Sequence, residues 1–380
     1  MELKEYRFNE VTINFDKKRV PLSGAQREKR QGKFRYYGAQ GVIDHIDDFI
    51  FDGTYLLIAE DGENLKSKKQ NIAQVVEGQF WVNNHAHIVQ GNELCNTRYL
   101  CYLLNSMDLS GYVTGSAQPK LSQANLNAVT LFLPPIAVQE QIVECLHLFD
   151  KKIAVNQKIN DNLEQQARAY FQELFVDNSD PTWTLGTVSD LGAVVGGSTP
   201  SKSKPEYYTE DGIAWITPKD LSINKAKFIS HGENDITELG LKNSSASIMP
   251  EGTVLFSSRA PIGYIAIASG EVTTNQGFKS VVPKSEIGTA YVYYFLKHNL
   301  PVIEGMASGS TFKEVSGNTM KNVPAVIPDT ETLACFNNFC APIFAQQRIL
   351  EEQNQSLATL RDSLLPKLMS GEIDVSDIKL

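Results

Sequence analysis

The chain has 380 residues, of which 42% are hydrophobic, 21% charged and 9% aromatic. This composition predicts a globular protein of two or three domains and excludes a fibrous or largely disordered chain. The net charge of −9 is unevenly distributed, so it does not by itself exclude a nucleic-acid partner.

Composition also bears on where the protein works. No stretch of eighteen residues is free of charged and polar side chains, and residues 1–7 contain no apolar segment. We therefore expect neither a membrane-spanning helix nor a secretory signal. The five cysteines form no Cys-x-x-Cys pair, and their number is odd. These features predict reduced thiols in a cytoplasmic protein without a zinc site.

The first part of the chain combines short strands with concentrated positive charge. Strands are expected at 56–58 and 80–82, and a helix at 97–105. Between residues 17 and 35 there are eight basic residues and one acid. Such a run is either a solvated loop or an edge that binds phosphates, and both interpretations stay open. His85 and His87 share a strand face, but without a nearby third ligand they favour a structural or base-facing role over a metal site.

A long helix follows at residues 139–175, which contain no proline or glycine and would span roughly 55 Å. Its apolar residues recur at coiled-coil spacing, and Asn156 and Asn160 form two polar layers that can fix register. The a and d positions of this seam are Ile142, Leu146, Phe149, Ile153, Asn156, Asn160, Leu163, Ala167, Tyr170 and Leu174.

The remaining chain repeats this order. Strands are expected at 213–216, 253–256, 264–267 and 280–282, and a helix at 290–298. A second coiled-coil region follows, in which Pro342 predicts a late start or a kink and Pro366 a break. Its a and d positions are Phe336, Cys340, Ile343, Gln347, Leu350, Asn354, Leu357, Arg361, Leu364 and Leu368.

Both halves match at a constant offset of about 194 residues. Gly115 falls on Gly309, Asn160 on Asn354 and Leu163 on Leu357. The chain thus predicts two copies of one unit, a mixed domain followed by a helix. Helices joined in this order must pair antiparallel, with the domains at opposite ends of a two-helix coiled coil and a pseudo-two-fold axis. The predicted α+β chain divides into domains at 1–135 and 179–330 and spacer helices at 136–178 and 331–380.

Catalytic motifs are absent from the sequence. There is no phosphate loop, no dinucleotide-binding glycine motif, no zinc-protease or hydrolase signature, and no Asn/Asp-Pro-Pro-aromatic motif of amino-methyltransferases. Instead, polar loops lie at corresponding places in both halves, at 115–120, 217–220, 257–260, 274–277 and 309–313. Arginine can contact guanine, amides can contact adenine, and hydroxyls and lysines can hold phosphates.

Several segments carry a resemblance to a known family. The clearest is Leu-Arg-Asp-Ser-Leu-Leu-Pro-Lys-Leu-Met-Ser-Gly-Glu-Ile at 360–373, followed by segments at 273–279, 255–263, 36–41 and 131–135. Together, over residues 17–375, they resemble the specificity subunit of type I restriction-modification systems. The resemblance implies two target recognition domains that each read half of a bipartite DNA sequence. It also implies helices that set the spacer, no cofactor and no catalysis by this chain. Its partners would be double-stranded DNA, two methyltransferase subunits and restriction/translocase subunits, with no membrane.

We take the candidate residues from loop chemistry and from the seams. Those expected to contact DNA are Arg27, Lys29, Arg30, Lys33, Arg35, Tyr37, Gln40, Asn84, Ser116, Gln118, Lys120, Thr217, Lys219, Ser258, Arg259, Asn275, Gln276, Ser310, Thr311 and Lys313. Those expected to pair the helices are Ile142, Leu146, Phe149, Ile153, Asn160, Leu163, Leu350, Asn354, Leu357 and Leu364.

A second apolar stripe lies outside the seams. It predicts docking of the methyltransferase subunits or packing on the chain's own domains. Its members are Val143, Leu148, Val155, Ile159, Phe171, Phe339, Phe344, Ile349 and Leu360. Two other functions remain open: a stand-alone DNA methyltransferase, against which the missing motifs argue, and a coiled-coil scaffold that binds no DNA.

Overall fold

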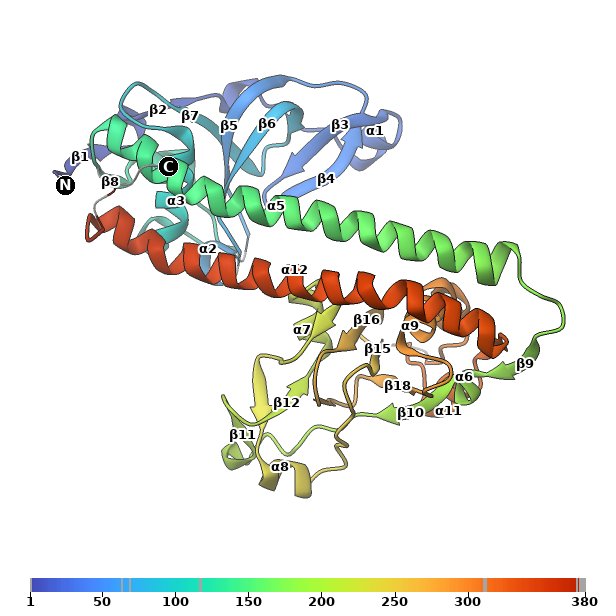
Figure 1. The fold of residues 1–380 in the computed structure, drawn as a ribbon. Helices are drawn as coiled ribbons and strands as arrows, with labels where there is room; N and C mark the ends of the chain where they lie inside the picture. The colour runs from blue at the N-terminus through green and yellow to red at the C-terminus, as the bar shows by residue number, and fades with distance from the viewer. Residues whose placement is uncertain are drawn as a thin grey trace. The chain divides into compact units, whose positions relative to one another are not determined.

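The computed structural model describes residues 2–62, 64–67, 70–115, 118–309, 313–373 and 375. The chain divides into two compact units. Unit 1 consists of Met1–Lys152 and Ser356–Leu380, and unit 2 of Ile153–Gln355. Each unit therefore contains one mixed α/β part together with part of both long helices, α5 (Ile136–Gln172) and α12 (Thr330–Ser370), which Figure 1 labels.

Unit 1 contains a six-stranded sheet of order β2-β7-β5-β6-β3-β4. The β3–β6 pair is parallel and the other pairs are antiparallel. A separate antiparallel pair joins β1 to β8. The elements are β1 (Lys4–Arg7), β2 (Thr12–Asn14), α1 (Gly24–Glu28), β3 (Gln31–Gly38), β4 (Gly41–Ile46), β5 (Phe51–Ala59), α2 (Asn64–Ser67), β6 (Ala73–Val82), β7 (Ala86–Gly91), α3 (Thr97–Ser106), α4 (Gln123–Asn127) and β8 (Thr130–Leu133).

Helix α3 anchors the core of unit 1. Asn96 caps it, accepting hydrogen bonds from the backbone N–H groups of Arg98 and Tyr99. Its buried face carries Tyr99, Leu100, Leu103 and Leu104, which pack with β5 and with the seam residues Ile142 and Leu146 of α5 in one core cluster. Burying each such leucine stabilises the unit by about 2 kcal/mol.

Unit 2 contains a five-stranded sheet of order β10-β18-β15-β16-β13, a four-stranded sheet of order β11-β14-β12-β17, and the pair β19-β9. The elements are β9 (Thr184–Thr187), α6 (Val188–Leu191), β10 (Gly192–Gly196), β11 (Tyr208–Thr209), β12 (Ile213–Ile216), α7 (Pro218–Ile223), β13 (Phe228–Ile229), β14 (Asn234–Ile236), α8 (Glu238–Lys242), β15 (Val254–Ser258), β16 (Ile262–Ala268), β17 (Thr273–Thr274), β18 (Lys279–Pro283), α9 (Thr289–His298), α10 (Leu300–Gly305), α11 (Gly317–Lys321) and β19 (Pro324–Ile327).

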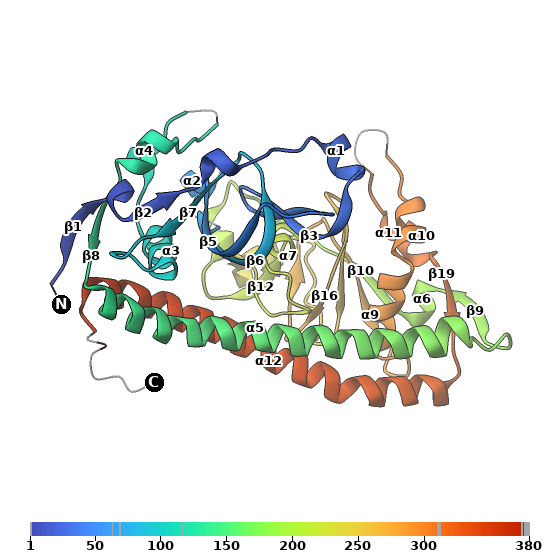
Figure 2. The same cartoon turned by 90° about the horizontal axis from the view of Figure 1, so that it is seen from above.

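The two long helices pair antiparallel within each unit, as Figure 2 also shows. In unit 1, Arg361 of α12 donates to the Asp150 carboxylate of α5 at 2.6 Å. In unit 2, the Asn156 side chain donates to Oδ1 of Asn354 at 2.9 Å. Partner numbers fall along α12 as they rise along α5, and the seam residues, among them Asn156, are buried or half-buried. The predicted antiparallel seam and the polar layer at Asn156 are confirmed, whereas at Asn160, among the described residues, only the backbone carbonyl is bonded across the seam, accepting from Gln347 at 3.2 Å.

The predicted late start at Pro342 and the predicted break at Pro366 are wrong. Helix α12 runs without a break from Thr330 to Ser370, through Pro342 and Pro366. Each proline costs the helix one backbone hydrogen bond, because it has no N–H. Both prolines lie on the exposed side, where they leave the packing of the apolar seam undisturbed. The first helix begins at Ile136, three residues before the predicted start, and ends in a π-helical turn at Glu173–Asp177.

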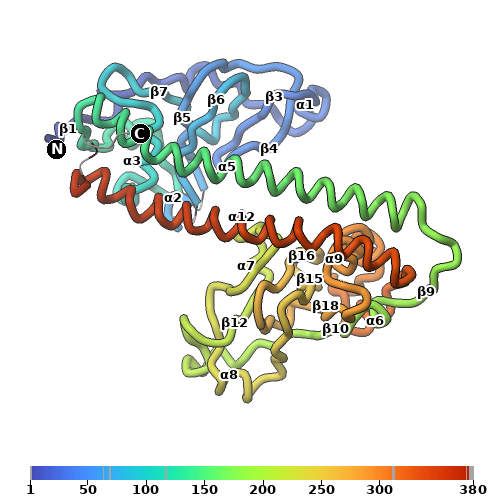
Figure 3. Tube along the Cα trace, in the orientation of Figure 1, coloured from blue at the N-terminus to red at the C-terminus, as the bar shows by residue number. Residues whose placement is uncertain are grey.

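The internal repeat is visible in the secondary structure and can be followed along the trace in Figure 3. Backbone bridges join Thr114 to Lys120 in unit 1 and Ser308 to Glu314 in unit 2, at an offset of 194. Short helices α4 and α11 and strands β8 and β19 correspond at the same offset. The predicted α+β repeat is confirmed. Within the described residues, no helix combines the length and the apolar character that crossing a bilayer requires.

Candidate nucleic-acid interface

A set of backbone hydrogen bonds ties four segments together beside the sheet of unit 1. The N–H of Asn83, which follows β6, donates to the carbonyl of Tyr37 at 3.0 Å. The Asn83 side-chain Oδ1 accepts from the N–H of His85 at 2.8 Å. The carbonyl of His85 accepts from the N–H of Glu60 at 2.9 Å, and the carbonyl of Glu60 from the N–H of Leu121 at 2.8 Å. We call this arrangement the loop frame.

Unit 2 repeats the loop frame bond by bond. The N–H of Asn275 donates to the carbonyl of Ile216 at 3.0 Å, and its Oδ1 accepts from the N–H of Gly277 at 2.8 Å. The carbonyl of Gly277 accepts from the N–H of Ser258 at 2.7 Å, and that of Ser258 from the N–H of Val315 at 3.0 Å. Both domains therefore hold their polar loops with the same set of hydrogen bonds.

Each loop frame carries three side chains directly beside its hydrogen-bonded residues, and we call these the rim positions. Both sets are solvent-accessible in part, and the two sets differ in chemistry. The rim positions are Asp61, Asn84 and Lys120 in unit 1, and Arg259, Gln276 and Glu314 in unit 2. Four of the six are among the DNA contacts predicted from the sequence; Asp61 and Glu314 are not, because an acid is not a ligand for the phosphate backbone.

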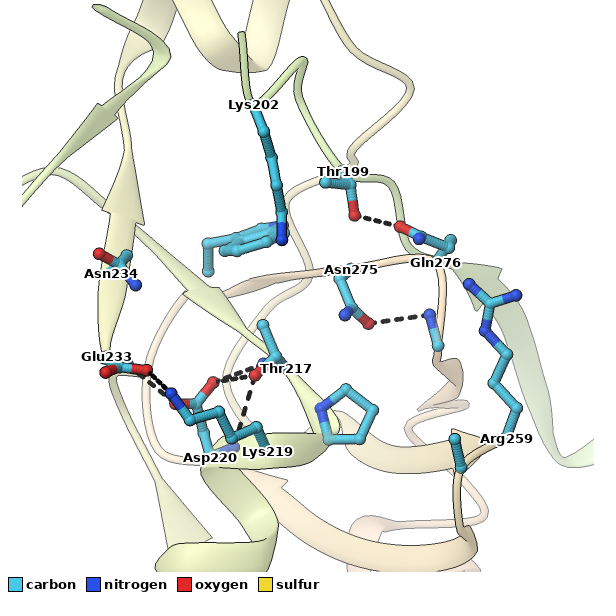
Figure 4. Close-up of a pocket in the computed structure, with 14 residues that line it drawn as sticks. Thr199, Lys202, Thr217, Lys219, Asp220, Glu233, Asn234, Arg259, Asn275 and Gln276 are labelled. Atoms are coloured by element: carbon cyan, nitrogen blue, oxygen red, sulfur yellow. Dashed lines mark hydrogen bonds and ion pairs between the residues drawn. The ribbon is translucent and has the colours of Figure 1, made fainter. Parts of the chain in front are cut away.

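A polar pocket of about 440 Å³ lies beside the loop frame of unit 2 (Figure 4). Five predicted residues from three separate segments line it, which are Thr217, Lys219, Arg259, Asn275 and Gln276. The structure thus brings together side chains that lie up to 59 positions apart in the sequence. Buried Trp215 adds an aromatic wall, and its Nε1–H donates to the carbonyl of Ser198 at 3.0 Å.

The lining side chains are held in place by hydrogen bonds that Figure 4 marks. Thr217 caps α7, and its N–H and hydroxyl both donate to Asp220 Oδ2, at 2.7 and 2.6 Å. Lys219 pairs with Glu233, and the Thr199 hydroxyl donates to Oε1 of Gln276. Such bonds orient the loops before any ligand arrives.

The pocket wall around the loop frame presents hydrogen-bond donors. Because a backbone N–H can only donate, the oxygen of the Asn275 amide must face Gly277, and its Nδ2 is left to face outward. Arg259 and the Nε2 of Gln276, which also belong to residues lining the pocket, add further donors. Phosphate oxygens and the N7 and O6 atoms of guanine are the DNA acceptors that such a wall fits.

The basic run of unit 1 is partly neutralised by the protein itself. Arg27 pairs with Asp44 at 2.9 Å, and Arg30 with Asp47 at 2.8 Å. Hydrogen bonds from the Gln31 side chain, a backbone N–H and Arg27 lower the pKa of Asp44. These two arginines are therefore committed to pairs within the domain, which the sequence pattern did not indicate.

The rest of the basic run is more open. Arg35 donates to the backbone carbonyl of Glu77 at 2.7 Å. Lys29 and Lys33 are exposed and form no ion pair with other described residues. Of the expected loop residues, Gln40, Gln118 and Lys313 are also exposed. These side chains are accessible to a phosphate backbone.

Two expected DNA contacts are buried, which corrects the prediction. Ser258 is fully buried at the end of β15, where its hydroxyl donates to the carbonyl of Gly277 at 3.1 Å. Tyr37 is 4% exposed, packs edge-on against Phe80, and burial raises its pKa. Both belong to the supporting structure beneath the loops. The expected contacts Ser116, Ser310 and Thr311 lie outside the described residues.

His87 has a structural role beneath the same loops. Its ring is buried, with Nδ1 at 2.6 Å from Oδ2 of Asp16 and Nε2 at 2.8 Å from the carbonyl of Leu121. Two acceptors at the two nitrogens require a doubly protonated ring. Although burial lowers the pKa of His87, Asp16 and the Leu121 carbonyl raise it overall. His87 thus cross-links segments of unit 1, and the base-facing alternative is wrong for this residue.

The second apolar stripe of the long helices divides into two groups. Val143, Phe171 and Phe344 pack into the cores of their own units, so the docking interpretation is wrong for these three. The others remain substantially exposed. They are Leu148 and Leu360 in unit 1 and Val155, Ile159, Phe339 and Ile349 in unit 2.

Comparison with known proteins identifies a family and several relatives. The family model described as "Type I restriction modification DNA specificity domain" matches residues 2–165 and 181–361. The type I restriction enzyme MjaIX specificity subunit of Methanocaldococcus jannaschii is 40% identical over 191 residues, covering 48% of this chain and 44% of the relative. The HindI specificity subunit of Haemophilus influenzae is 24% identical over 405 aligned residues, covering 85% of this chain and 84% of the relative.

A solved structure agrees at the level of fold. The S subunit of a type I restriction-modification system from M. genitalium superimposes with a TM-score of 0.61 at 14% identity, covering 97% of this chain and 96% of that one. The family model and the repeated fold lead to one conclusion. The chain belongs to the family of type I restriction-modification DNA specificity domains, and it carries two of them.

Proposed function

We propose that unit 1 and unit 2 each read one half of a bipartite DNA sequence as the specificity subunit of a type I restriction-modification enzyme. The observation that carries this proposal is the loop frame, which recurs bond by bond in both units with different rim side chains. A shared scaffold with different chemistry suits two readers of the same polymer with different sequences.

A domain exchange tests this division of labour. Residues 179–330 are replaced by the matching region of a relative with a known target, and methylation in cells carrying the modification subunits is mapped. We expect one half-site to change while the other keeps its sequence. The reciprocal exchange of residues 1–135 is the matched control and should change the opposite half-site. A change in both halves from either exchange would contradict modular reading.

We also propose that two methyltransferase subunits dock on the exposed apolar side chains of the long helices, and that restriction/translocase subunits join this assembly. Leu148 of unit 1 is 50% exposed and Ile159 of unit 2 is 41% exposed, although each lies on a helix whose seam residues are buried or half-buried. An apolar side chain left in water at such a position is typical of a protein interface.

Stoichiometry measures this docking directly. Leu148→Asp and Ile159→Asp should each reduce the number of bound methyltransferase subunits from two to one in native mass spectrometry, because a charge is costly inside an apolar interface. Lys151→Asp and Gln157→Asp, at exposed polar positions of the same helix, are the controls. Two bound subunits with both apolar variants would exclude docking at these residues.

Catalysis is proposed to reside in the partner subunits. The purified chain should transfer no methyl group from S-adenosylmethionine to DNA and should cut no DNA. Its complex with the modification subunits should methylate a bipartite motif. Methylation by the chain alone would refute this assignment and favour a stand-alone methyltransferase.

A further inference from the structure

The two loop frames separate what the domains share from what differs between them. The frame asparagines, Asn83 and Asn275, make the same hydrogen bonds in both units. Two of the three rim positions hold opposite charges in the two units, and the third holds an amide in both. Asp61 of unit 1 corresponds to Arg259 of unit 2, since each follows the residue that donates to the carbonyl of His85 or Gly277.

The second charged rim position is inverted in the same way. Lys120 and Glu314 each precede the residue, Leu121 or Val315, whose N–H closes the frame. A backbone bridge holds Asp61 beside Lys120 in unit 1. In unit 2, Arg259 lies 3.5 Å from Glu314. The two charged rim positions of each frame thus hold one acid and one base, but in the opposite order; in unit 1 Lys120 also lies 3.3 Å from Glu60 and Asp61 lies 2.8 Å from His85.

These groups are placed for contact with a ligand. The side chains of Arg259 and Glu314 are 38% and 39% exposed, and that of Lys120 is 54% exposed. The exposed salt bridge between Arg259 and Glu314 adds little to the stability of the fold, so stability does not explain why these two charges are present. Gln276, the amide rim residue of unit 2, is also exposed, and hydrogen bonding to Thr199 fixes its oxygen.

We propose that the rim positions are the residues that determine sequence specificity, and that Asn275, the partly exposed frame asparagine, holds the phosphate backbone whatever the sequence, whereas buried Asn83 supports the loops of unit 1. This inference rests on the proposed function. A cationic rim residue donates to N7 and O6 of guanine, and an acidic one accepts from N4 of cytosine. Because the acid and the base occupy exchanged rim positions in the two units, the contacts to guanine and to cytosine should also be exchanged between the two half-sites.

Exchanging the two charges of unit 2 tests the proposal. The double variant Arg259→Glu/Glu314→Arg keeps an ion pair between positions 259 and 314 and gives unit 2 the charge order of unit 1, although it loses the 3.7 Å contact between Glu314 and Lys279. It is assembled with the modification subunits, and methylation is mapped across the genome beside the wild type. We expect guanine and cytosine to exchange within the half-site read by unit 2, with roughly 10- to 100-fold changed preference at each altered position. The other half-site and the spacer should not change.

A frame variant gives the contrasting result. Asn275→Asp keeps the oxygen that accepts from Gly277 and replaces the outward donor with a negatively charged oxygen. If Asn275 holds a phosphate, binding should weaken on all sequences alike, and the methylated motif should stay the same. A changed motif from Asn275→Asp would overturn the division between frame and rim.

The remaining outcomes are also decisive. A wild-type complex without a bipartite motif refutes the proposed function itself. A wild-type motif that the double variant methylates unchanged and undiminished refutes the role of the rim. If circular dichroism shows that the double variant is unfolded, Gln276→Glu decides instead, because it keeps the oxygen bonded to Thr199 and reverses only the outward donor. Gln276→Glu must then alter the half-site of unit 2, and an unaltered motif overturns the proposal.

Discussion

A single buried lysine, Lys227, joins the domain of unit 2 to both long helices. Its ammonium donates to Oε1 of Gln347 on α12 at 2.7 Å and to the hydroxyl of Tyr294 on α9 at 3.2 Å. It also pairs with the carboxylate of Glu164 on α5 and lies 4.2 Å from the centroid of the Phe344 ring. Because Lys227 is only 7% exposed, these partners replace the water that it loses.

Replacing this lysine by methionine keeps the apolar stem and removes the charge. Removing one partner of a buried pair typically costs about 3–5 kcal/mol. Here Glu164 keeps Lys297 at 2.9 Å and the Tyr294 hydroxyl at 2.8 Å, and the cost of burying the lysine disappears. We therefore expect Lys227→Met to lower the free energy of unfolding of unit 2 by about 2–3 kcal/mol. In a unit of this size that loss corresponds to a Tm lower by roughly 4–12 °C.

Differential scanning calorimetry and hydrogen exchange of the 153–177 and 330–355 segments measure this effect. Lys225→Met is the matched control, because Lys225 is exposed two residues away. Ordinary surface substitutions change the unfolding free energy by about 0.5 kcal/mol or less. If the unfolding free energies of Lys227→Met and Lys225→Met differed by no more than this, the buried charge of Lys227 would not stabilise unit 2.

The pH dependence gives an independent check on the same pair. Although burial raises the pKa of Glu164, Lys227 and Lys297 lower it overall to about 2. A depressed carboxylate stabilises the fold above its ordinary pKa of 4.5 and loses that contribution as the pH falls toward 2. The deficit of Lys227→Met should therefore be full above pH 4.5 and shrink below it. A deficit that is constant across this range would show that lost packing, and not charge, is responsible.

Three further predictions concern unit 1 and the helices. His87→Leu should destabilise unit 1 by about 3–5 kcal/mol in urea unfolding. Because the pKa of Asp16 is lowered and that of His87 raised, the loss should be greatest between their ordinary values of 3.8 and 6.5 and smaller on either side. The double variant Asn156→Leu/Asn354→Leu should raise the unfolding free energy by about 1–2 kcal/mol, because a buried polar pair in a coiled-coil seam fixes register at a cost in stability. An unchanged or lower unfolding free energy would show that the asparagine pair stabilises the seam. Inserting four residues after both Asn160 and Asn354 should lengthen each helix by about 6 Å, and with it the mapped spacer by about two base pairs. The same insertion after Asn160 alone should abolish methylation, because the two helices can then no longer pair in register. If the double insertion were active and kept the old spacer, the helices would not set the spacer length.

Local patterns in the sequence determined much of this protein. The helices, the seam with Asn156 opposite Asn354, the internal repeat and most strands follow from periodicity, which short segments carry whatever surrounds them. The helix-breaking tendency of proline wrongly predicted a late start at Pro342, because packing of the whole seam outweighs the loss of one backbone hydrogen bond within it.

The tertiary structure alone decided which polar residues are available to a ligand. Ser258 and Tyr37 have the composition of contact residues, yet strand packing buries them. Arg27 has the charge of a phosphate ligand, but strand register places Asp44 beside it. Conversely, the rim acid Glu314 becomes a candidate only when the loop frame places it 3.5 Å from Arg259. Burial and ion pairing depend on residues distant in sequence, so no local pattern could have shown which side chains face the solvent.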